Sequence, residues 1–318
     1  MTDLTTPLVL QSRALIPQLR FALPDLHAYE TVSDKLRLFE LAQRAGVRVP
    51  ATAVVTRASL GELRTDTFEY PVVIKPRQSA MRLDSGMTKR GVRYAASARE
   101  LKAVIAENLI DDSDELLLQE YVTGHGAGVF GLYDAGKPVF FFAHRRLRER
   151  PPSGGVSVLS ESVALPEEGV AAANALLQPL QWHGVAMIEF KVDDKGRLWL
   201  IEINARLWGS LQLAIDSGAD FPWFLYQLAT AGIVSAPPPY EIGKRLRWWL
   251  GDLDNLYARL RNRGWNGSAA DKLGAIAEFA LPWRPRMRYE FLRWDDPGPA
   301  FAAFRQYAEA LQGKRKSI

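Results

Sequence analysis

The sequence of 318 residues contains no cysteine. Disulfide bonds, a thiolate nucleophile and thiolate metal sites are therefore excluded, and the composition suits a reducing compartment. Histidine is scarce as well, because only His27, His125, His144 and His183 occur, and their spacing does not match a zinc site. A zinc enzyme is therefore not expected.

The sequence also has little net charge and no long apolar run. The chain has 40 lysines and arginines and 36 acidic residues, so its formal net charge is +4. This mild positive charge is consistent with binding a small anionic ligand and does not imply binding of nucleic acid. The densest basic run, residues 145–150, is short and lacks interleaved aromatic residues. Charged residues break the first twenty positions, so neither a secretory signal nor a transmembrane helix is expected. We predict a cytoplasmic protein that does not insert stably into a membrane.

The sequence contains enough hydrophobic residues, 47% of the total, to form the cores of two lobes. Apolar spacing and turn signals predict helices at 35–42, 98–108 and 167–181, and strands at 72–74, 116–122, 128–133 and 139–144. The first helix would be capped by Asp34 and would end at Gly46. Residues 1–33 show little periodicity.

Residues 244–265 are rich in arginine and tryptophan. Their apolar positions form a helical stripe of Leu250, Leu253, Leu256, Tyr257 and Leu260. Such a helix fits docking on the protein body or lying on a membrane surface. Two acids in the same helix, Asp252 and Asp254, would oppose anionic lipid and favour docking.

The most informative segment is residues 184–210, GVAMIEFKVDDKGRLWLIEINARLWGS. The turn sequence Asp-Asp-Lys-Gly at 193–196 separates two apolar runs rich in strand formers, which predicts a β-hairpin. A two-residue turn would place Glu189 opposite Leu200. Period-two alternation would then put Glu189, Glu202 and Asn204 on one face.

Two carboxylates and an amide on one face are ligands of the kind that Mg²⁺ prefers, and Mg²⁺ usually takes one or two protein carboxylates together with substrate phosphates. Glu202 and Asn204 interrupt an otherwise apolar run, so an acidic face that serves only solubility is the weaker explanation. The sequence therefore predicts a site for Mg²⁺, or for Mn²⁺, formed by Glu189, Glu202 and Asn204.

This hairpin resembles the metal-binding segment of the ATP-grasp superfamily, in which an acid on one strand is followed by E-x-N-x-R on the next. Here Glu189 precedes residues 202–206, Glu-Ile-Asn-Ala-Arg. The continuation R-L-W-G-S is similar to the predicted carboxylate-amine ligase branch of that superfamily, which is carbamoyl-phosphate-synthase-like. The resemblance covers about residues 34–233, and its motifs occur in the family's order.

The resemblance implies that ATP is bound by two lysines. Lys35 lies in a D-K helix followed by G-V-x-V-P, and Lys75 ends the strand V-V-I-K-P; the corresponding family lysines reach the phosphates, a role that suits a compact charge on a long stem. A solvated helix position explains Lys35 equally well. The polar residues 77–90, including Ser79, Ser85, Lys89 and Arg90, would form a mobile lid over the phosphates.

Four further positions correspond to the hinge that binds the adenine edge: Gln119, Glu120, Tyr121 and Val122. Arg146 and Arg206 are candidates to neutralise the γ-phosphoryl group, which arginine forks do well. The sequence departs from the family pattern at the ribose. Many family members carry an acidic residue that holds the ribose hydroxyls, and this chain has His-Gly-Ala-Gly at the corresponding positions, 125–128.

The implied fold is α+β, an ATP-grasp fold of two α+β lobes with ATP between them, extended by a mainly helical C-terminal region. We divide the chain into a short N-terminal remnant (1–33), the small lobe and first part of the core (34–121), the large lobe with the metal site (122–236) and the Arg/Trp-rich extension (237–318). Family members usually begin with a compact α/β domain, for which residues 1–33 are too short. The extension, a homodimer contact, a partner chain or a large carrier-linked substrate could make up for it.

The resemblance implies an ATP-dependent ligase that activates a carboxylate as an acyl phosphate and joins it to an amine, releasing ADP and phosphate. Two alternatives are a non-catalytic subunit or sensor that binds Mg²⁺-ATP, and a kinase that uses the same nucleotide site. The identities of the carboxylate and the amine are not encoded in any motif that we recognise.

Overall fold

The computed structural model describes residues 2–78, 80–83, 86–89, 91–108, 115–235, 237–261, 267–281 and 285–316. The chain divides into two compact units, each assembled from separate stretches of sequence. Unit 1 comprises residues 1–141, 165–208 and 222–235, and unit 2 comprises residues 142–164, 209–221 and 236–318. These two units do not follow the four consecutive segments that we predicted from the sequence. The boundaries of those segments stay a prediction.

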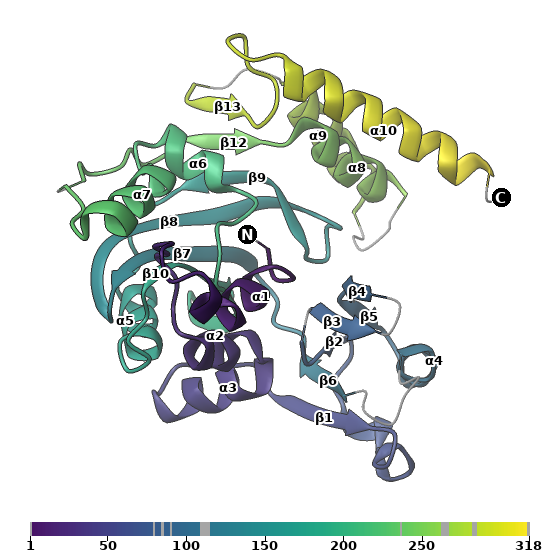
Figure 1. Ribbon diagram of the computed structural model, residues 1–318. Helices are drawn as coiled ribbons and strands as arrows, with labels where there is room; N and C mark the ends of the chain where they lie inside the picture. The colour runs from purple at the N-terminus through teal and green to yellow at the C-terminus, as the bar shows by residue number, and fades with distance from the viewer. Residues whose placement is uncertain are drawn as a thin grey trace. The chain divides into compact units, whose positions relative to one another are not determined.

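Unit 1 begins with three helices and a small sheet (Figure 1). The helices are α1 (Thr6–Gln11), α2 (Leu26–Ser33) and α3 (Lys35–Arg44). The sheet has the strand order β1-β6-β2-β5, from β1 (Thr52–Thr56), β2 (Val72–Pro76), β5 (Arg93–Ala95) and β6 (Glu115–Glu120). Helix α4 (Ala98–Asn108) covers it through Leu101, Val104 and Ile105, the spacing predicted from sequence.

Between β2 and β5 lies a separate two-stranded sheet, β3 (Ala80–Leu83) with β4 (Gly86–Lys89). These strands occupy the segment predicted to be a phosphate lid, so its described backbone is a hairpin where a loop was expected. Ser79, Ser85 and Arg90 of that prediction lie outside the described residues.

The rest of unit 1 is organised by three antiparallel strands in the order β11-β10-β7: β7 (His125–Asp134), β10 (Gly184–Val192) and β11 (Leu198–Asn204). Helices α5 (Glu167–Leu177) and α7 (Phe221–Ala231) also belong to this unit. The long strand β8 (Lys137–Arg150) starts in unit 1 and continues into unit 2.

Unit 2 contains strands β9 (Val156–Ser162), β12 (Arg245–Arg247) and β13 (Met287–Tyr289) beside the end of β8, and helices α6 (Leu211–Asp216), α8 (Trp249–Leu260), α9 (Ala269–Ala280) and α10 (Gly298–Lys316). The part that follows residue 236 is thus mainly helical, as predicted (Figure 1). Strands β9 and β12 were not predicted; β12 has only three residues, two of them arginines.

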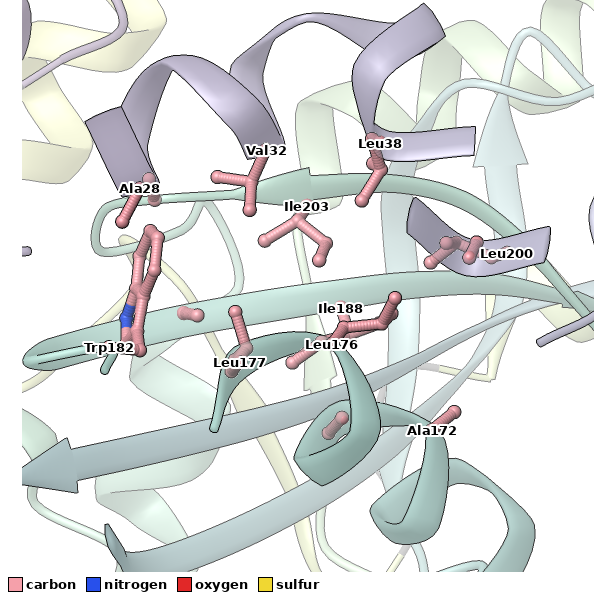
Figure 2. Close-up of a cluster of buried hydrophobic side chains, with 14 of the residues drawn as sticks. Ala28, Val32, Leu38, Ala172, Leu176, Leu177, Trp182, Ile188, Leu200 and Ile203 are labelled. Carbon is pink, nitrogen blue, oxygen red and sulfur yellow. The ribbon is translucent and has the colours of Figure 1, made fainter. Parts of the chain in front are cut away.

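The main core of unit 1 lies on one face of β10 and β11. Figure 2 shows side chains of α2, α3 and α5 meeting those of the two strands, among them Val32, Leu38, Leu176, Ile188 and Ile203. Alternation along β10 sends Ala186, Ile188 and Phe190 into this core. The intervening residues, including Glu189, therefore lie on the opposite face.

The N-terminal residues are more ordered than their sequence suggested. Asp25 caps α2, accepting a hydrogen bond of 2.7 Å from the backbone N–H of Ala28. Leu10, Tyr29 and Val32 are buried in the same core as α3 and β11. Residues 1–33 show little periodicity because α2 is short, and its apolar positions gain their partners only in the folded protein.

Helix α8 also differs from its predicted stripe. Leu250 is buried, but the other deeply buried side chains are polar, Asp252 and Asn255, while Tyr257 is 50% exposed. Asp252 accepts hydrogen bonds from Arg148 Nε and Arg247 Nε, both at 2.6 Å. Buried charges need such partners, so this helix docks within unit 2 through ion pairs as well as apolar contact. In the predicted segment, residues 262–265 lie outside the described residues, as does residue 236 of the preceding linker.

None of the described helices is long and apolar enough to span a membrane.

We expect Trp182→Ala to destabilise the protein by about 3–5 kcal/mol. The Trp182 side chain is fully buried in the core of Figure 2, and its Nε1 donates to the carbonyl oxygen of Val185 at 3.4 Å. Removing the ring would leave a cavity and a carbonyl without this donor. Urea unfolding measures the loss. Trp294→Ala serves as the control, because Trp294 is 94% exposed; equal losses in the two variants would contradict the core assignment.

Candidate functional site

The predicted hairpin forms, but with a different register. The backbone N–H of Asp193 donates to the carbonyl of Arg197 at 3.1 Å, and Gly196 adopts a φ of +75°, which closes a three-residue turn. Phe190 then faces Leu200, whereas Glu189 faces Glu202. The prediction that Glu189 would face Leu200 was wrong, because the turn is one residue longer and a β-bulge follows.

The bulge determines which side chains share one face of the hairpin. With the three-residue turn alone, Glu189 would face Ile201 and point away from Glu202. The register shift between Glu189 and Phe190 leaves Ile201 without a direct partner and brings Glu189 and Glu202 opposite each other. Asn204, two residues beyond Glu202, lies on the same face. The structure therefore brings together the three residues of the predicted metal site.

This donor set fits a hard divalent cation. Like charges directly opposite one another destabilise a strand pair, and Glu189 and Glu202 are such a pair. Asn204 Nδ2 donates to Glu202 Oε1 at 3.0 Å, which orients the amide beside the carboxylates. The described residues contain no cluster of three or more His, Asp or Glu side chains suited to a metal. A cation here would therefore depend on two carboxylates, one amide and oxygen atoms from a ligand.

Lys75 lies buried beside these acids. Its side chain is only 6% exposed, and Nζ donates to Gln119 Oε1 at 2.8 Å. Burial lowers the pKa of Lys75 to about 8; the charges of Glu202 and Glu189 oppose this shift, and those of Lys35 and Lys191 add to it. Three lysines and two glutamates thus interact electrostatically within unit 1.

Lys35 is held at the start of α3 by a local network. Asp34 caps the helix, accepting from the backbone N–H of Leu36 at 3.0 Å. Arg77 ties this cap to the small sheet, because it donates to Asp34 at 2.8 Å and to Glu115 at 2.6 Å. Lys35 itself is only 5% exposed, so its position on the helix is buried and not solvated.

The hinge segment begins as strand and leaves the sheet after Glu120. Gln119 is buried, accepts from Lys75 and donates to Thr52 Oγ1 at 3.1 Å. The backbone N–H of Glu120 donates to the carbonyl of Ala51 at 2.9 Å, so this N–H already has a partner within the protein. Strand structure was predicted to continue to residue 122, and it ends at 120.

The two residues that follow differ in environment. Tyr121 packs edge-on against Tyr94, with ring centroids 6.0 Å apart, and Val122 is 9% exposed. Nearby, Gly124 has a φ of +130°, and a Cβ there would lie 2.0 Å from the carbonyl oxygen of Val192. Only glycine allows this close approach between the hinge and the end of β10.

The two candidate arginines lie in different units. Arg206, in unit 1, donates to Asn204 Oδ1 at 3.0 Å and forms a two-pronged ion pair with Asp3. Arg146, in unit 2, donates to Glu149 Oε1 at 3.0 Å and to the carbonyl of Gly155 at 3.2 Å. Each guanidinium thus has a carboxylate partner within its own unit.

Two residues of this region escaped the sequence analysis. Lys191 lies on the same strand face as Glu189, two positions on, and its Nζ is 3.5 Å from the carbonyl oxygen of Gly124; strand periodicity alone could have identified it. Asp3 had no sequence signal, because 203 positions separate it from Arg206.

Comparison with known proteins gives consistent results. Residues 112–250 match the family described as "ATP-grasp in the biosynthetic pathway with Ter operon". The mitochondrial propionyl-CoA carboxylase alpha chain of Sus scrofa is 27% identical over 197 residues, which cover 58% of this chain and 26% of that protein. The chain thus spans about a quarter of the length of this curated relative.

Solved structures show the same fold. L-amino acid ligase from Bacillus licheniformis has a TM-score of 0.55 and 19% identity over 71% of this chain and 54% of its own. The biotin carboxylase domain of 2-oxoglutarate carboxylase from Hydrogenobacter thermophilus, in complex with MgADP and bicarbonate, has a TM-score of 0.57 and 18% identity over 74% and 54%. D-alanine–D-alanine ligase from Bacillus anthracis, complexed with ATP, has a TM-score of 0.51 and 18% identity over 70% and 73%. The fold, the hairpin motif and the family match therefore agree: the chain has an ATP-grasp fold, and residues 112–250 match an ATP-grasp family.

Proposed function

We propose that unit 1 binds ATP together with Mg²⁺ and that the protein is an ADP-forming ligase that joins a carboxylate to an amine. The observation that carries this proposal is the buried Lys75, whose charge interacts with Glu189, Glu202 and Lys35. A buried ammonium group and a facing pair of carboxylates call for a ligand that carries both anionic oxygens and a divalent cation. Mg²⁺-ATP has this composition.

Each residue group would have a distinct task in this proposal. Lys75 and Lys35 would bind phosphate oxygens as point charges, and Gln119, Glu120, Tyr121 and Val122 would border the adenine. Glu189, Glu202 and Asn204 would hold Mg²⁺, or Mn²⁺, which supplies charge neutralisation at the terminal phosphates. Arg206 would offset further charge while it keeps its contacts with Asp3. Arg146 lies in unit 2, and the same task for it stays a prediction from the sequence.

The proposed reaction has two steps. An oxygen of the substrate carboxylate attacks the γ-phosphorus in line, the bond to the ADP oxygen breaks, and an acyl phosphate forms. The amine nitrogen then attacks the acyl carbon, phosphate leaves, and the amine proton passes to solvent. Neither step needs a protein nucleophile, which agrees with a sequence without cysteine. Positioning and electrostatics would supply the rate enhancement.

A protein that binds Mg²⁺-ATP without turnover is the second candidate. It is favoured by the carboxylate partners of both arginines, since Asp3 and Glu149 reduce the positive charge available to a phosphoryl group. A homodimer contact or a partner chain that completes a substrate pocket would be compatible with either candidate.

The test is release of ADP and phosphate from Mg²⁺-ATP with pooled amino acids, uronic acids and peptides, in the presence of hydroxylamine as a trap. We expect a hydroxamate to form with one pool and only when ATP is present. ADP without hydroxamate, but with a stable phosphorylated product, would indicate a kinase. Nucleotide binding without ADP from any pool would support the binding subunit and count against the ligase.

A further inference from the structure

Arg206 is almost saturated by contacts within the protein. A guanidinium group has five N–H donors. Nε donates to Asp3 Oδ1, Nη2 donates to Asp3 Oδ2 at 3.1 Å and to Asn204 Oδ1 at 3.0 Å, and Nη1 donates to the carbonyl of Leu207 at 3.1 Å. Four of the five donors therefore have acceptors, and two of these four point to a single carboxylate.

A contact with a buried core residue helps to fix the position of Asp3. Tyr29 donates its hydroxyl to the carbonyl of Asp3 at 3.3 Å, and the Tyr29 ring is buried. The next residues form α1, which inserts Leu10 into the same core. The turn that carries Asp3 is thus anchored on the helices that pack beneath β11.

The ion pair is shielded from solvent. The side chains of Arg206 and Asp3 are 22% and 23% exposed, so their attraction is less screened than that of a surface pair. Arginine keeps its positive charge in proteins, and Asp3 supplies the opposite charge next to it. Arg206 is therefore a charged group beside the proposed metal site.

Arg206 in turn fixes the orientation of Asn204. The amide oxygen accepts from Arg206, and the amide nitrogen donates to Glu202 Oε1. These two bonds determine which end of the amide is oxygen. A carbonyl oxygen has two lone pairs, so Oδ1 can accept from Arg206 and still ligate a cation.

We propose that Asp3 is a positioning residue for the metal site and acts through Arg206 on Asn204 and Glu202. The inference rests on the proposed function, because it assumes that Asn204 and Glu202 hold a divalent cation. Asp3 would have two effects. It locks the geometry of the guanidinium that orients the amide, and its negative charge offsets a positive charge that would otherwise repel the cation.

The charge of Asp3 distinguishes the positioning role from an alternative role, in which Asp3 competes with an anionic ligand for Arg206. If Asp3 merely occupied a phosphate position on Arg206, removing its charge would tighten the binding of an anionic nucleotide. If Asp3 supports the metal site, removing its charge weakens cation binding and leaves metal-free nucleotide binding intact. The two roles therefore predict different responses to one substitution.

The test uses the full chain and Asp3→Asn, with Mn²⁺ and ADP as probes. Mn²⁺ affinity in saturating ADP is measured by electron paramagnetic resonance, and ADP affinity without metal by calorimetry. We expect about a tenfold loss of Mn²⁺ affinity, with metal-free ADP affinity unchanged within about twofold. Asp3→Glu, which keeps the carboxylate, should recover most of the Mn²⁺ affinity. Asp66→Asn is the control, since Asp66 pairs with Arg64 at 3.2 Å on the exposed surface.

A double-mutant cycle tests whether Asp3 acts through Arg206. In an Arg206→Gln background, Asp3→Asn should cause little further loss of Mn²⁺ affinity. Thermal unfolding without metal establishes that each variant is folded; if Asp3→Asn does not fold, Asp3→Ser, which also removes the carboxylate, and its cycle with Arg206→Gln provide the same comparison.

Several results would overturn the inference: unchanged Mn²⁺ affinity in Asp3→Asn, tighter metal-free ADP binding as its sole effect, or an equal loss with and without Arg206. Wild-type protein that binds ADP but no Mn²⁺ would overturn both this inference and the proposed metal site. Wild-type Mn²⁺ binding that is insensitive to Asp3 would overturn the inference alone, so the two failures are distinguishable.

Discussion

Glu202→Gln is expected to abolish metal-dependent turnover, with a loss on the order of a hundredfold to a thousandfold, the size typical of removing one preorganised electrostatic contact. Glutamine keeps the volume of glutamate but loses its charge. Glu202 faces Glu189 directly and accepts from Asn204, so it lies at the centre of the donor set. Hydroxamate formation measures turnover, and Mn²⁺ titration in the presence of ADP measures the site itself.

Folding of this variant should change little. The substitution removes repulsion with Glu189 and attraction to Lys75, and these effects oppose each other. Glu168→Gln is the matched control, because Glu168 is an exposed partner of Arg48 at 3.2 Å. Turnover and Mn²⁺ affinity that equal those of the control would remove Glu202 from the proposed site.

Lys75→Met is expected to stabilise the protein while it weakens nucleotide binding. Burial lowers the pKa of Lys75 from 10.5 to about 8, which corresponds to roughly 3 kcal/mol against the charged form in the folded state. Methionine avoids that penalty but leaves Gln119 Oε1 without its donor. We therefore expect a net gain of about 1–3 kcal/mol at pH 7, together with a ten- to hundredfold loss of ADP affinity from the missing charged contact.

The pH dependence of stability gives an independent check. Below pH 8 Lys75 is protonated in both states, and the folded state carries the full penalty. Between about pH 8 and 10.5 the unfolded state binds more protons at this position, so the contribution of Lys75 to the free energy of unfolding rises with pH. Lys75→Met should lack this rise. Urea unfolding of both proteins from pH 7 to 10 measures it, and identical pH profiles would show that Lys75 is not desolvated.

Local patterns in the sequence predicted much of the fold. Helix α4 has the bounds that the spacing of Leu101, Val104 and Ile105 indicated. Asp34 caps α3, and Gly46 adopts the left-handed conformation just beyond that helix. These features depend on residues close together in sequence, for which periodicity and capping chemistry are sufficient.

The candidate site was predicted only in part. The shared face of Glu189, Glu202 and Asn204 follows from alternation, but the hairpin reached it by a longer turn and a compensating bulge at Ile201. Turn length and bulges depend on small differences in backbone energy that the residue types do not specify uniquely.

The sequence by itself determined the superfamily motifs, the absence of thiol chemistry and the residue types available to bind a cation and phosphates. Only the tertiary structure decided that the N-terminal helices complete the core and that Asp3 pairs with Arg206. It also buried Lys75 beside the two glutamates, which gives the lysine its lowered pKa. The physical reason is the same in each case: burial and long-range pairing arise from segments distant in sequence, and no local pattern encodes which of them will meet.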